Sequence, residues 1–195
     1  MDLNGSKTLQ NLVNSFAGEC QAHNRYKFYA EMAQNDGYFY VGNMIKEIAD
    51  NELAHSKLFF DHIQSGLSYD AHNLLVNAGY PFVIGATDAN MRFSEQAEME
   101  EHTSIYPDYA KVAQEEGFAA IASSFQMIAA VEGLHQRVFC DLATQLSDGS
   151  LYRKATPTQW KCYNCAYVHE STEAWSICPL CKHPQGFVIP DIDMK

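Results

Sequence analysis

Basic residues are scarce in this chain of 195 residues: 13 lysines and arginines stand against 24 aspartates and glutamates, which gives a formal net charge of −11. A protein that binds nucleic-acid phosphates or an anionic membrane surface carries an excess of basic residues, so we expect neither partner. The sequence also lacks an uncharged apolar run of membrane-spanning length. Its start, MDLNGSKTLQNL, has no basic segment followed by an apolar one, so we expect no secretory signal and a cytoplasmic location.

The six cysteines are unevenly placed along the chain. In a cytoplasmic protein, cysteines favour metal binding over disulfides. Four of them form two CxxC motifs near the C-terminus, and four thiolates at this spacing fit a tetrahedral Zn²⁺ or a single iron ion. These four are Cys162, Cys165, Cys178 and Cys181.

The composition of the chain changes after residue 147. Long amphipathic stretches give way to short segments rich in Pro, Thr, Tyr and Cys. We therefore predict a helical domain over residues 1–147, a linker over 148–157 and a small metal domain over 158–195. The aromatic residues expected to form the core of the small domain are Trp160, Tyr163, Tyr167, Trp175 and Phe187.

The helical part contains an internal repeat. AEMAQNDGY at 30–38 matches AKVAQEEGF at 110–118, and in each copy a glycine, Gly37 or Gly117, follows a helical stretch as a C-terminal signal. Each half therefore predicts a helical hairpin, and together they predict an all-α four-helix bundle. The segment 66–87 is too long for a tight turn, so it should cross the length of the bundle, and Thr87 or Asp88 should cap the third helix. The four helices are expected over 7–35, 38–65, 88–115 and 118–147.

Glutamates and histidines interrupt the apolar faces of these helices. A bare carboxylate in a bundle core costs on the order of several kcal/mol, and five together repel one another, so a positive partner is required. Glu on two helices with Glu-x-x-His on the other two is the known pattern of carboxylate-bridged di-iron and di-manganese bundles. Five carboxylates stay within one charge of neutrality with two ferrous or two ferric ions, which suits a redox site. The candidate ligands are Glu19, Glu52, His55, Glu98, Glu101, Glu132 and His135.

The third predicted helix carries one residue more than the first. Glu19 precedes Tyr26 by seven residues, whereas Glu98 precedes Tyr106 by eight. A π-bulge absorbs one extra residue in a helix and often marks a functional site, so we predict such a bulge between Glu98 and Ala110. His23 follows Glu19 on the same helical face, and we expect it to act through a ligand rather than to bind metal itself.

These residues together resemble the rubrerythrin family, in which a ferritin-like di-iron bundle precedes a rubredoxin-like domain. The likeness covers nearly the whole chain. GECQAHNRYKFYA, NELAH, AEMEEHTSIYPDYAKVAQEEGF and VEGLH resemble the four helices of the family, and CYNC and CPLCKHP resemble its rubredoxin knuckles. Some positions depart from the family pattern. Ala166 and Lys182 follow knuckle cysteines where Gly is common, and they would strain a turn that favours positive φ.

The resemblance implies two non-haem irons and one Fe(Cys)4 per chain. Glu52 and Glu132 would bridge the two irons, with Glu19 and His55 on one iron and Glu98 and His135 on the other. Glu101 would be an additional carboxylate that replaces His55 as a ligand on oxidation. Two tyrosines would hydrogen-bond carboxylate ligands, and the implied catalytic set is Glu101, His55, Tyr26 and Tyr106.

The activity implied by the resemblance is reduction of hydrogen peroxide to water, with electrons passing from the rubredoxin-type iron to the di-iron site. Because the sequence has no dinucleotide-binding fingerprint, the electrons would come from NAD(P)H through a separate reductase, or from a rubredoxin. From Glu132 to the expected helix end at Ser147 is about 22 Å, which is long for electron transfer within one chain. We therefore predict a head-to-tail homodimer. A ferroxidase or O₂-activating di-iron oxidase, and a zinc-stabilised non-catalytic binding module, stay open as alternatives.

Overall fold

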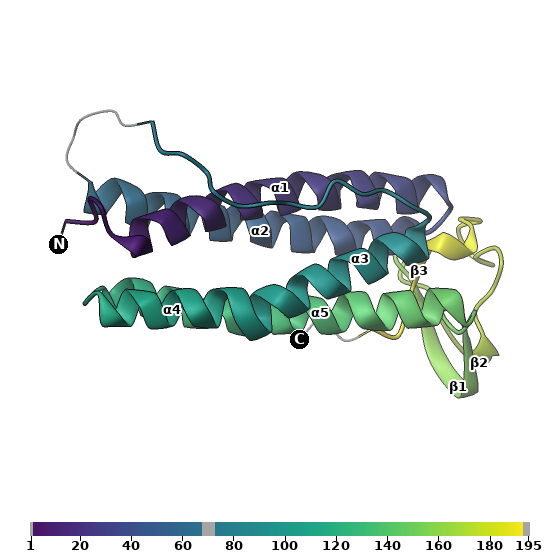
Figure 1. Cartoon of the computed structure of the whole chain (residues 1–195). Helices are drawn as coiled ribbons and strands as arrows, with labels where there is room; N and C mark the ends of the chain where they lie inside the picture. Colours follow the sequence, from purple (N-terminus) through teal and green to yellow (C-terminus); the bar gives the residue numbers. More distant parts are fainter. Residues whose placement is uncertain (1, 68–72, 193–195) are drawn as a thin grey trace.

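The computed structural model of the chain describes residues 2–67 and 73–192. A long helical bundle carries a small three-stranded sheet at one end (Figure 1). α3, η1 and α4 join end to end into one rod, which counts as one helix of the bundle beside α1, α2 and α5. The predicted four-helix ferritin-like bundle is therefore confirmed. No helix among the described residues is long and apolar enough to cross a membrane. The helical elements are α1 (Lys7–Asn35), α2 (Phe39–Gly66), α3 (Thr87–Glu100), the π-helix η1 (Glu101–Ile105), α4 (Tyr106–Glu115) and α5 (Ala119–Ser147).

The two hairpin turns have the same local structure, as the repeat predicts. Gly37 has φ 92° and Gly117 has φ 85°, a region that glycine adopts without the steric cost of a Cβ. The next residue in each turn donates its N–H back to a carbonyl five residues earlier, at 2.8 Å in both cases. The glycines therefore end α1 and α4 in the same way.

The connection between the halves runs as an extended segment along α1 (Figure 1). Part of the expected crossover, residues 68–72, lies outside the described residues. The predicted cap of α3 was wrong, because Ala86 occupies the N-cap position and Thr87 already lies in the first turn. The Thr87 hydroxyl donates instead to the Asp36 carboxylate at 2.6 Å, which joins the start of α3 to the end of α1.

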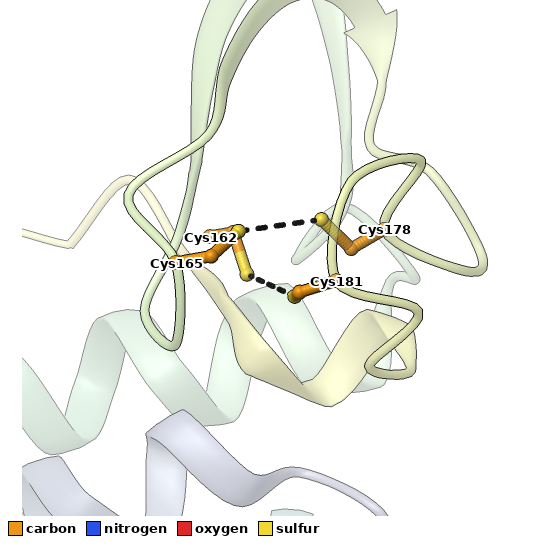
Figure 2. A group of neighbouring side chains, drawn as sticks. All are labelled: Cys162, Cys165, Cys178 and Cys181. Atoms are coloured by element: carbon orange, nitrogen blue, oxygen red, sulfur yellow. Dashed lines mark hydrogen bonds between the residues drawn. The ribbon is translucent and has the colours of Figure 1, made fainter.

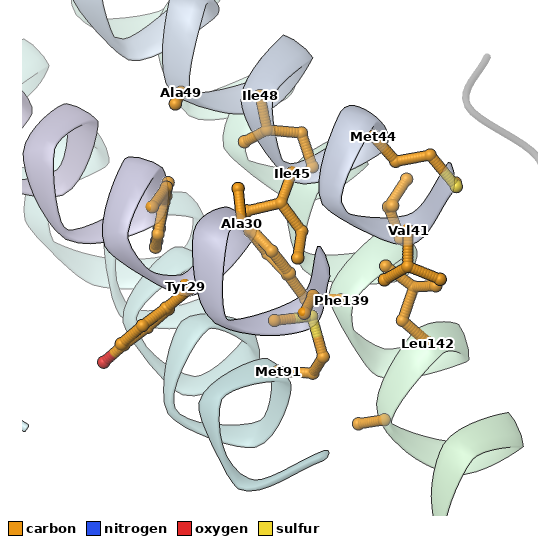
Figure 3. Close-up of a cluster of buried hydrophobic side chains, with 14 of the residues drawn as sticks. Tyr29, Ala30, Val41, Met44, Ile45, Ile48, Ala49, Met91, Phe139 and Leu142 are labelled. Carbon is orange, nitrogen blue, oxygen red and sulfur yellow. The ribbon is translucent and has the colours of Figure 1, made fainter. Parts of the chain in front are cut away.

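The core of the bundle consists of two apolar clusters with a polar layer between them. One cluster packs residues 22–33 of α1 against residues 41–49 of α2 and 138–143 of α5 (Figure 3). The other packs the beginnings of α1 and α5 against α4 and the end of α2. Glu52 and Glu132 fall in the gap between the clusters, and both are at most 1% exposed.

The C-terminal region folds around a sheet with the strand order β2-β1-β3. Trp160 on β1 is fully buried and packs against Ala174 and Val188. The aromatic core was predicted wrongly for two residues: Tyr163 is 52% exposed, and Phe187 stacks on Phe39 of α2 with ring centroids 4.0 Å apart. These two rings attach the region to the bundle. The strands are β1 (Arg153–Cys162), which begins inside the predicted linker, β2 (Val168–Glu173) and β3 (Val188–Ile189).

Candidate metal centres

Six of the predicted ligands converge in the polar layer of the bundle. They form two overlapping groups, and within each group one ligand atom per residue lies within 4.8 Å of the others. Both groups contain Glu52 and Glu132, so these two carboxylates stand where bridging ligands of a metal pair would stand. The first group is Glu19, Glu52, His55 and Glu132, and the second is Glu52, Glu98, Glu132 and His135.

The two imidazoles face the shared carboxylates from opposite sides. Nδ1 of His55 lies 3.0 Å from Glu52 Oε2 and 3.0 Å from Glu132 Oε1. Nδ1 of His135 lies 3.0 Å from Glu52 Oε1 and 2.8 Å from Glu132 Oε2. Each carboxylate therefore turns one oxygen to each imidazole, which is the arrangement that two bridged ions need.

Several ligand atoms of these residues are not satisfied by hydrogen bonds to one another, as the ligands of a metal pair need not be. Four glutamates and His135 each have at least one buried polar atom without a well-oriented hydrogen bond in the described part of the chain. The short contacts of His135 Nδ1 lack hydrogen-bond geometry, although their lengths are those of ion pairs. Oxygen and imidazole nitrogen donors are the ligands that non-haem iron takes, and ions here would satisfy all these atoms.

Two tyrosines hold the outer carboxylates from across the bundle. Tyr26 on α1 donates its hydroxyl proton to Glu98 Oε1 on α3, and Tyr106 on α4 donates to Glu19 Oε1 on α1. Both phenols are at most 1% exposed. Each half of the molecule therefore orients a carboxylate of the other half, and the hydrogen bonds expected of these tyrosines are present.

Without metal, protons compensate the crowded negative charge. Burial, together with the neighbouring carboxylates, raises the pKa of Glu98 to about 8 and that of Glu19 well above its usual range. Although burial opposes it, the Glu132 and Glu52 carboxylates, which accept hydrogen bonds from the imidazole, raise the pKa of His55 to about 9. Metal binding would release these protons, because carboxylate and neutral imidazole are the forms that coordinate.

Asn51 supports the ring of His135 from the side opposite the carboxylates. Its amide nitrogen lies 3.3 Å from His135 Nε2. The side-chain amide can also turn to present its oxygen, which would accept the Nε2–H and leave Nδ1 free to coordinate. Such a partner fixes the tautomer of a metal-binding histidine.

Glu101 belongs to neither metal-binding group of the described residues. It is the first residue of η1, so the predicted π-bulge is confirmed. Its side chain lines a cavity of about 320 Å³ between α1, the crossover and the η1 segment. Its role as a metal ligand stays a prediction.

Two histidines, His23 and His102, fasten the helices that carry the ligands. Nδ1 of His23 donates to the carbonyl of Ala49, and Nδ1 of His102 donates to the carbonyl of Ala129, both at 2.6 Å. This contact of His23 is with the backbone of α2, and its expected action through a metal ligand stays a prediction. The ring of His102 lies directly over Gly133, where a Cβ would come within 2.8 Å of its Cε1 atom.

The four C-terminal cysteines form a second candidate metal site (Figure 2). Their sulfurs lie 3.6 Å apart between Cys162 and Cys181 and 3.7 Å apart between Cys165 and Cys178. A tetrahedral ion with metal–sulfur bonds of about 2.3 Å places its sulfurs about 3.8 Å apart. A hydrogen bond from the backbone N–H of His183 lowers the pKa of Cys181 to about 5, which favours the thiolate that a metal requires.

The turns after the cysteine pairs adopt the conformation that the sequence predicted. Ala166 has φ 60° and Lys182 has φ 65°, in the left-handed region that costs a side-chain-bearing residue about 1–2 kcal/mol. The N–H groups of these residues donate to the carbonyls of Cys162 and Cys178. The knuckles therefore form in spite of the backbone strain.

Sequence reasoning missed three residues near the di-metal site. Asn51 gave no signal, because its role depends on the neighbouring helix. Gly133 did give a signal in the sequence. A glycine inside a long helix costs about 1 kcal/mol relative to alanine, so its presence indicates that another group packs closely against the helix there. Arg25 is a lone cation on a buried face of α1 and is only 7% exposed.

Comparisons with known proteins agree with this architecture. The sequence model of the rubrerythrin family matches residues 10–143, and that of the rubrerythrin rubredoxin-like domain matches residues 160–187. Rubrerythrin-1 of Clostridium acetobutylicum is 40% identical, with 95% of this chain and 94% of the relative covered. Rubrerythrin of Nitratidesulfovibrio vulgaris is 38% identical, with 94% of each covered.

Solved structures show the same fold. A partially reduced nigerythrin aligns with a TM-score of 0.64 at 23% identity, over 97% of this chain and 91% of the other. A bacterioferritin of Mycobacterium tuberculosis aligns with a TM-score of 0.63 at 15% identity, over 77% of this chain and 89% of the other. From the two sequence models and the full-length relatives it follows that this chain belongs to the rubrerythrin family, with a di-iron site in its bundle and an Fe(Cys)4 site in its rubredoxin-like region.

Proposed function

We propose that the protein is a non-haem di-iron peroxidase that reduces hydrogen peroxide to water in defence against oxidative stress. The observation that carries the proposal is the overlap of two metal-binding groups through Glu52 and Glu132, with Glu101 in the adjoining helix at the wall of a cavity. A buried metal pair is suited to two-electron chemistry. An Fe(Cys)4 site would return the electrons one at a time.

The reaction breaks the O–O bond: H₂O₂, two protons and two electrons give two water molecules. When bound, the two irons would supply one electron each. Tyr26 and Tyr106 hold Glu98 and Glu19 in fixed orientations, so these two carboxylates would keep their positions while the charge of the site changes. Glu101 lines the cavity from which the peroxide would come, and its carboxyl group would pass a proton to a departing oxygen.

We further propose that electrons cross between chains of a head-to-tail homodimer. The aromatic contact of Tyr163 with Tyr40, at 5.1 Å between ring centroids, places the first cysteine knuckle beside the start of α2. From Tyr40 to Glu52 the helix rises about 18 Å. A partner chain running the other way would bring its cysteine site to the middle of the bundle. An NAD(P)H-dependent reductase or a rubredoxin would supply the electrons from outside.

The test is anaerobic reduction of the iron-loaded protein followed by a small excess of H₂O₂ over the three electrons that each chain holds, with the absorbance of both iron sites recorded in time. We expect rapid oxidation of the di-iron site and slower oxidation of the Fe(Cys)4 site. Glu101→Ala should retain its iron content and lose at least tenfold in rate. If O₂ oxidises the reduced protein faster than H₂O₂ does, the oxidase alternative is supported instead. Equal rates in wild type and Glu101→Ala would remove the special role of Glu101.

A further inference from the structure

We propose that the cavity beside Glu101 binds organic hydroperoxides, an inference that rests on the peroxide-reducing function proposed above. The cavity has a volume of about 320 Å³ and lies between α1, residues 78–83 of the crossover and the α3–η1–α4 rod. Hydrogen peroxide needs about the space of two water molecules, roughly 60 Å³. The cavity is several times larger and falls in the size range of pockets for organic ligands.

The wall of the cavity is largely aromatic and aliphatic. Four rings line it, together with the methyl groups of Ala22 and Ala97. The Tyr80 ring approaches α1 closely because Gly18 has no Cβ: one built there would lie 3.2 Å from Tyr80 Cε1. The Tyr80 hydroxyl is already occupied as a donor to the Asn14 carbonyl at 2.5 Å, so Tyr80 offers the cavity its ring. The four rings are Tyr80, Phe93, Tyr106 and Tyr109.

One buried cation stands out among the polar residues that line the cavity. Arg25 lines the cavity and is only 7% exposed, and its Nε and Nη1 atoms have no hydrogen-bond partner in the described part of the chain. A buried guanidinium with two unpartnered nitrogens, which carry three N–H groups, favours a ligand that brings an acceptor. The carboxylate of Glu101, on the same cavity, can accept a proton from that ligand. A hydroperoxide group is both acceptor and donor, so it matches this pair.

The surface next to the cavity is apolar as well. A second hollow of about 430 Å³ shares four lining residues with the cavity, among them Arg25 and Pro81. Three exposed apolar side chains surround it: Phe28 is 60% exposed, Phe82 is 92% exposed and Ile84 is 63% exposed. Apolar side chains grouped on a surface mark binding sites for apolar groups. Hydrated H₂O₂ gains nothing from such a rim, whereas a hydrocarbon-bearing peroxide does.

The reaction keeps the balance of the proposed function. A hydroperoxide ROOH, two protons and two electrons give ROH and water, and the O–O bond is the bond that breaks. The electrons come from the same external donor as for H₂O₂. The alcohol ROH keeps the hydrocarbon group and can therefore serve as an unreactive probe of the same cavity.

The test uses cumene hydroperoxide as substrate and its product, 2-phenyl-2-propanol, as a ligand of the metal-free full-length chain. Ala97→Leu enlarges a lining residue on α3 and Ala78→Leu one on the crossover, and Ala130→Leu on the exposed face of α5 is the matched control. We expect the kcat/KM for cumene hydroperoxide, relative to that for H₂O₂, to fall at least tenfold in both cavity variants and to stay unchanged in the control. The alcohol should shift the amide NMR signals of cavity residues in a saturable way, and both cavity variants should lose this effect.

The outcomes separate this inference from the function on which it rests. Turnover of H₂O₂ without turnover of cumene hydroperoxide would overturn the inference and leave the peroxidase proposal standing. Turnover of neither peroxide would overturn the peroxidase proposal and the inference with it. If the alcohol binds no better to wild type than to the two cavity variants, the cavity is not the site.

Discussion

Replacing Gly133 by alanine should have opposite effects on stability in the presence and absence of the His102 ring. In an ordinary helix interior the change from glycine to alanine stabilises by about 1 kcal/mol. Here the new methyl group would lie 2.8–3.1 Å from three atoms of the imidazole. The ring cannot retreat without stretching its 2.6 Å hydrogen bond to the Ala129 carbonyl.

The expected size follows from these opposing effects. Overpacking costs about 1–3 kcal/mol, so Gly133→Ala should destabilise the wild-type chain by about 0–2 kcal/mol after the gain in helix propensity. In a His102→Ala background nothing opposes the methyl group, and the same change should stabilise by about 1 kcal/mol. The coupling energy of the double-mutant cycle is then about 1–3 kcal/mol.

Urea unfolding of the four metal-free proteins, followed by the circular dichroism of the helices, measures this coupling. Working without metal keeps iron affinity out of the comparison. The reasoning would be refuted if Gly133→Ala changed the free energy of unfolding equally in both backgrounds. That result would mean that the ring moves aside freely and does not fasten η1 to α5.

Three further predictions follow from the site geometry. Ala166→Gly should raise the stability of the metal-loaded rubredoxin-like region by about 0.5–1 kcal/mol, because glycine relieves the positive φ but is freer in the unfolded chain; an unchanged thermal midpoint of the Fe(Cys)4 absorbance would contradict this. The metal-free protein should lose stability as the pH rises from 6 to 9, because folded Glu98 (pKa about 8) and His55 (pKa about 9) retain protons that the unfolded chain has released. Urea midpoints that stay level or rise over this pH range would contradict the prediction. Glu52 does not add to the pH dependence above pH 6, because the histidines lower its pKa to about 2 despite its burial. Cys162→Ser should abolish the Fe(Cys)4 absorbance and leave the helical circular dichroism unchanged, and loss of helix content would show that the bundle depends on the cysteine site.

Much of the bundle could be predicted because local signals and the repeat agree. Gly37 and Gly117 end helices through their backbone conformation, which needs no tertiary information. The extra residue before Tyr106 can be accommodated in a continuous helix by a π-helical turn. The Glu-x-x-His pairs face inward because helical periodicity turns positions i and i+3 to the same side. These features depend on spacing, which a sequence states directly.

The errors lie where contacts between distant segments decide. Ala86 caps α3 because the hydroxyl of Thr87 has a better partner, Asp36, on another helix. Phe187 lies outside the small aromatic core because its ring stacks on Phe39 at the end of the bundle. The cavity at Arg25 depends on the path of the crossover, and an extended segment without periodicity does not reveal what it covers.

The reciprocal tyrosine–glutamate hydrogen bonds also bear on how such a molecule could have arisen. Since each hairpin orients a carboxylate of the other, a single hairpin could satisfy both bonds by pairing with an identical copy of itself. A self-associating ancestor of half the present length, later duplicated and fused, would therefore have had a working ligand cage from the outset. The residue inserted in η1 would then mark the point at which the two copies ceased to be equivalent, because only one of them acquired Glu101.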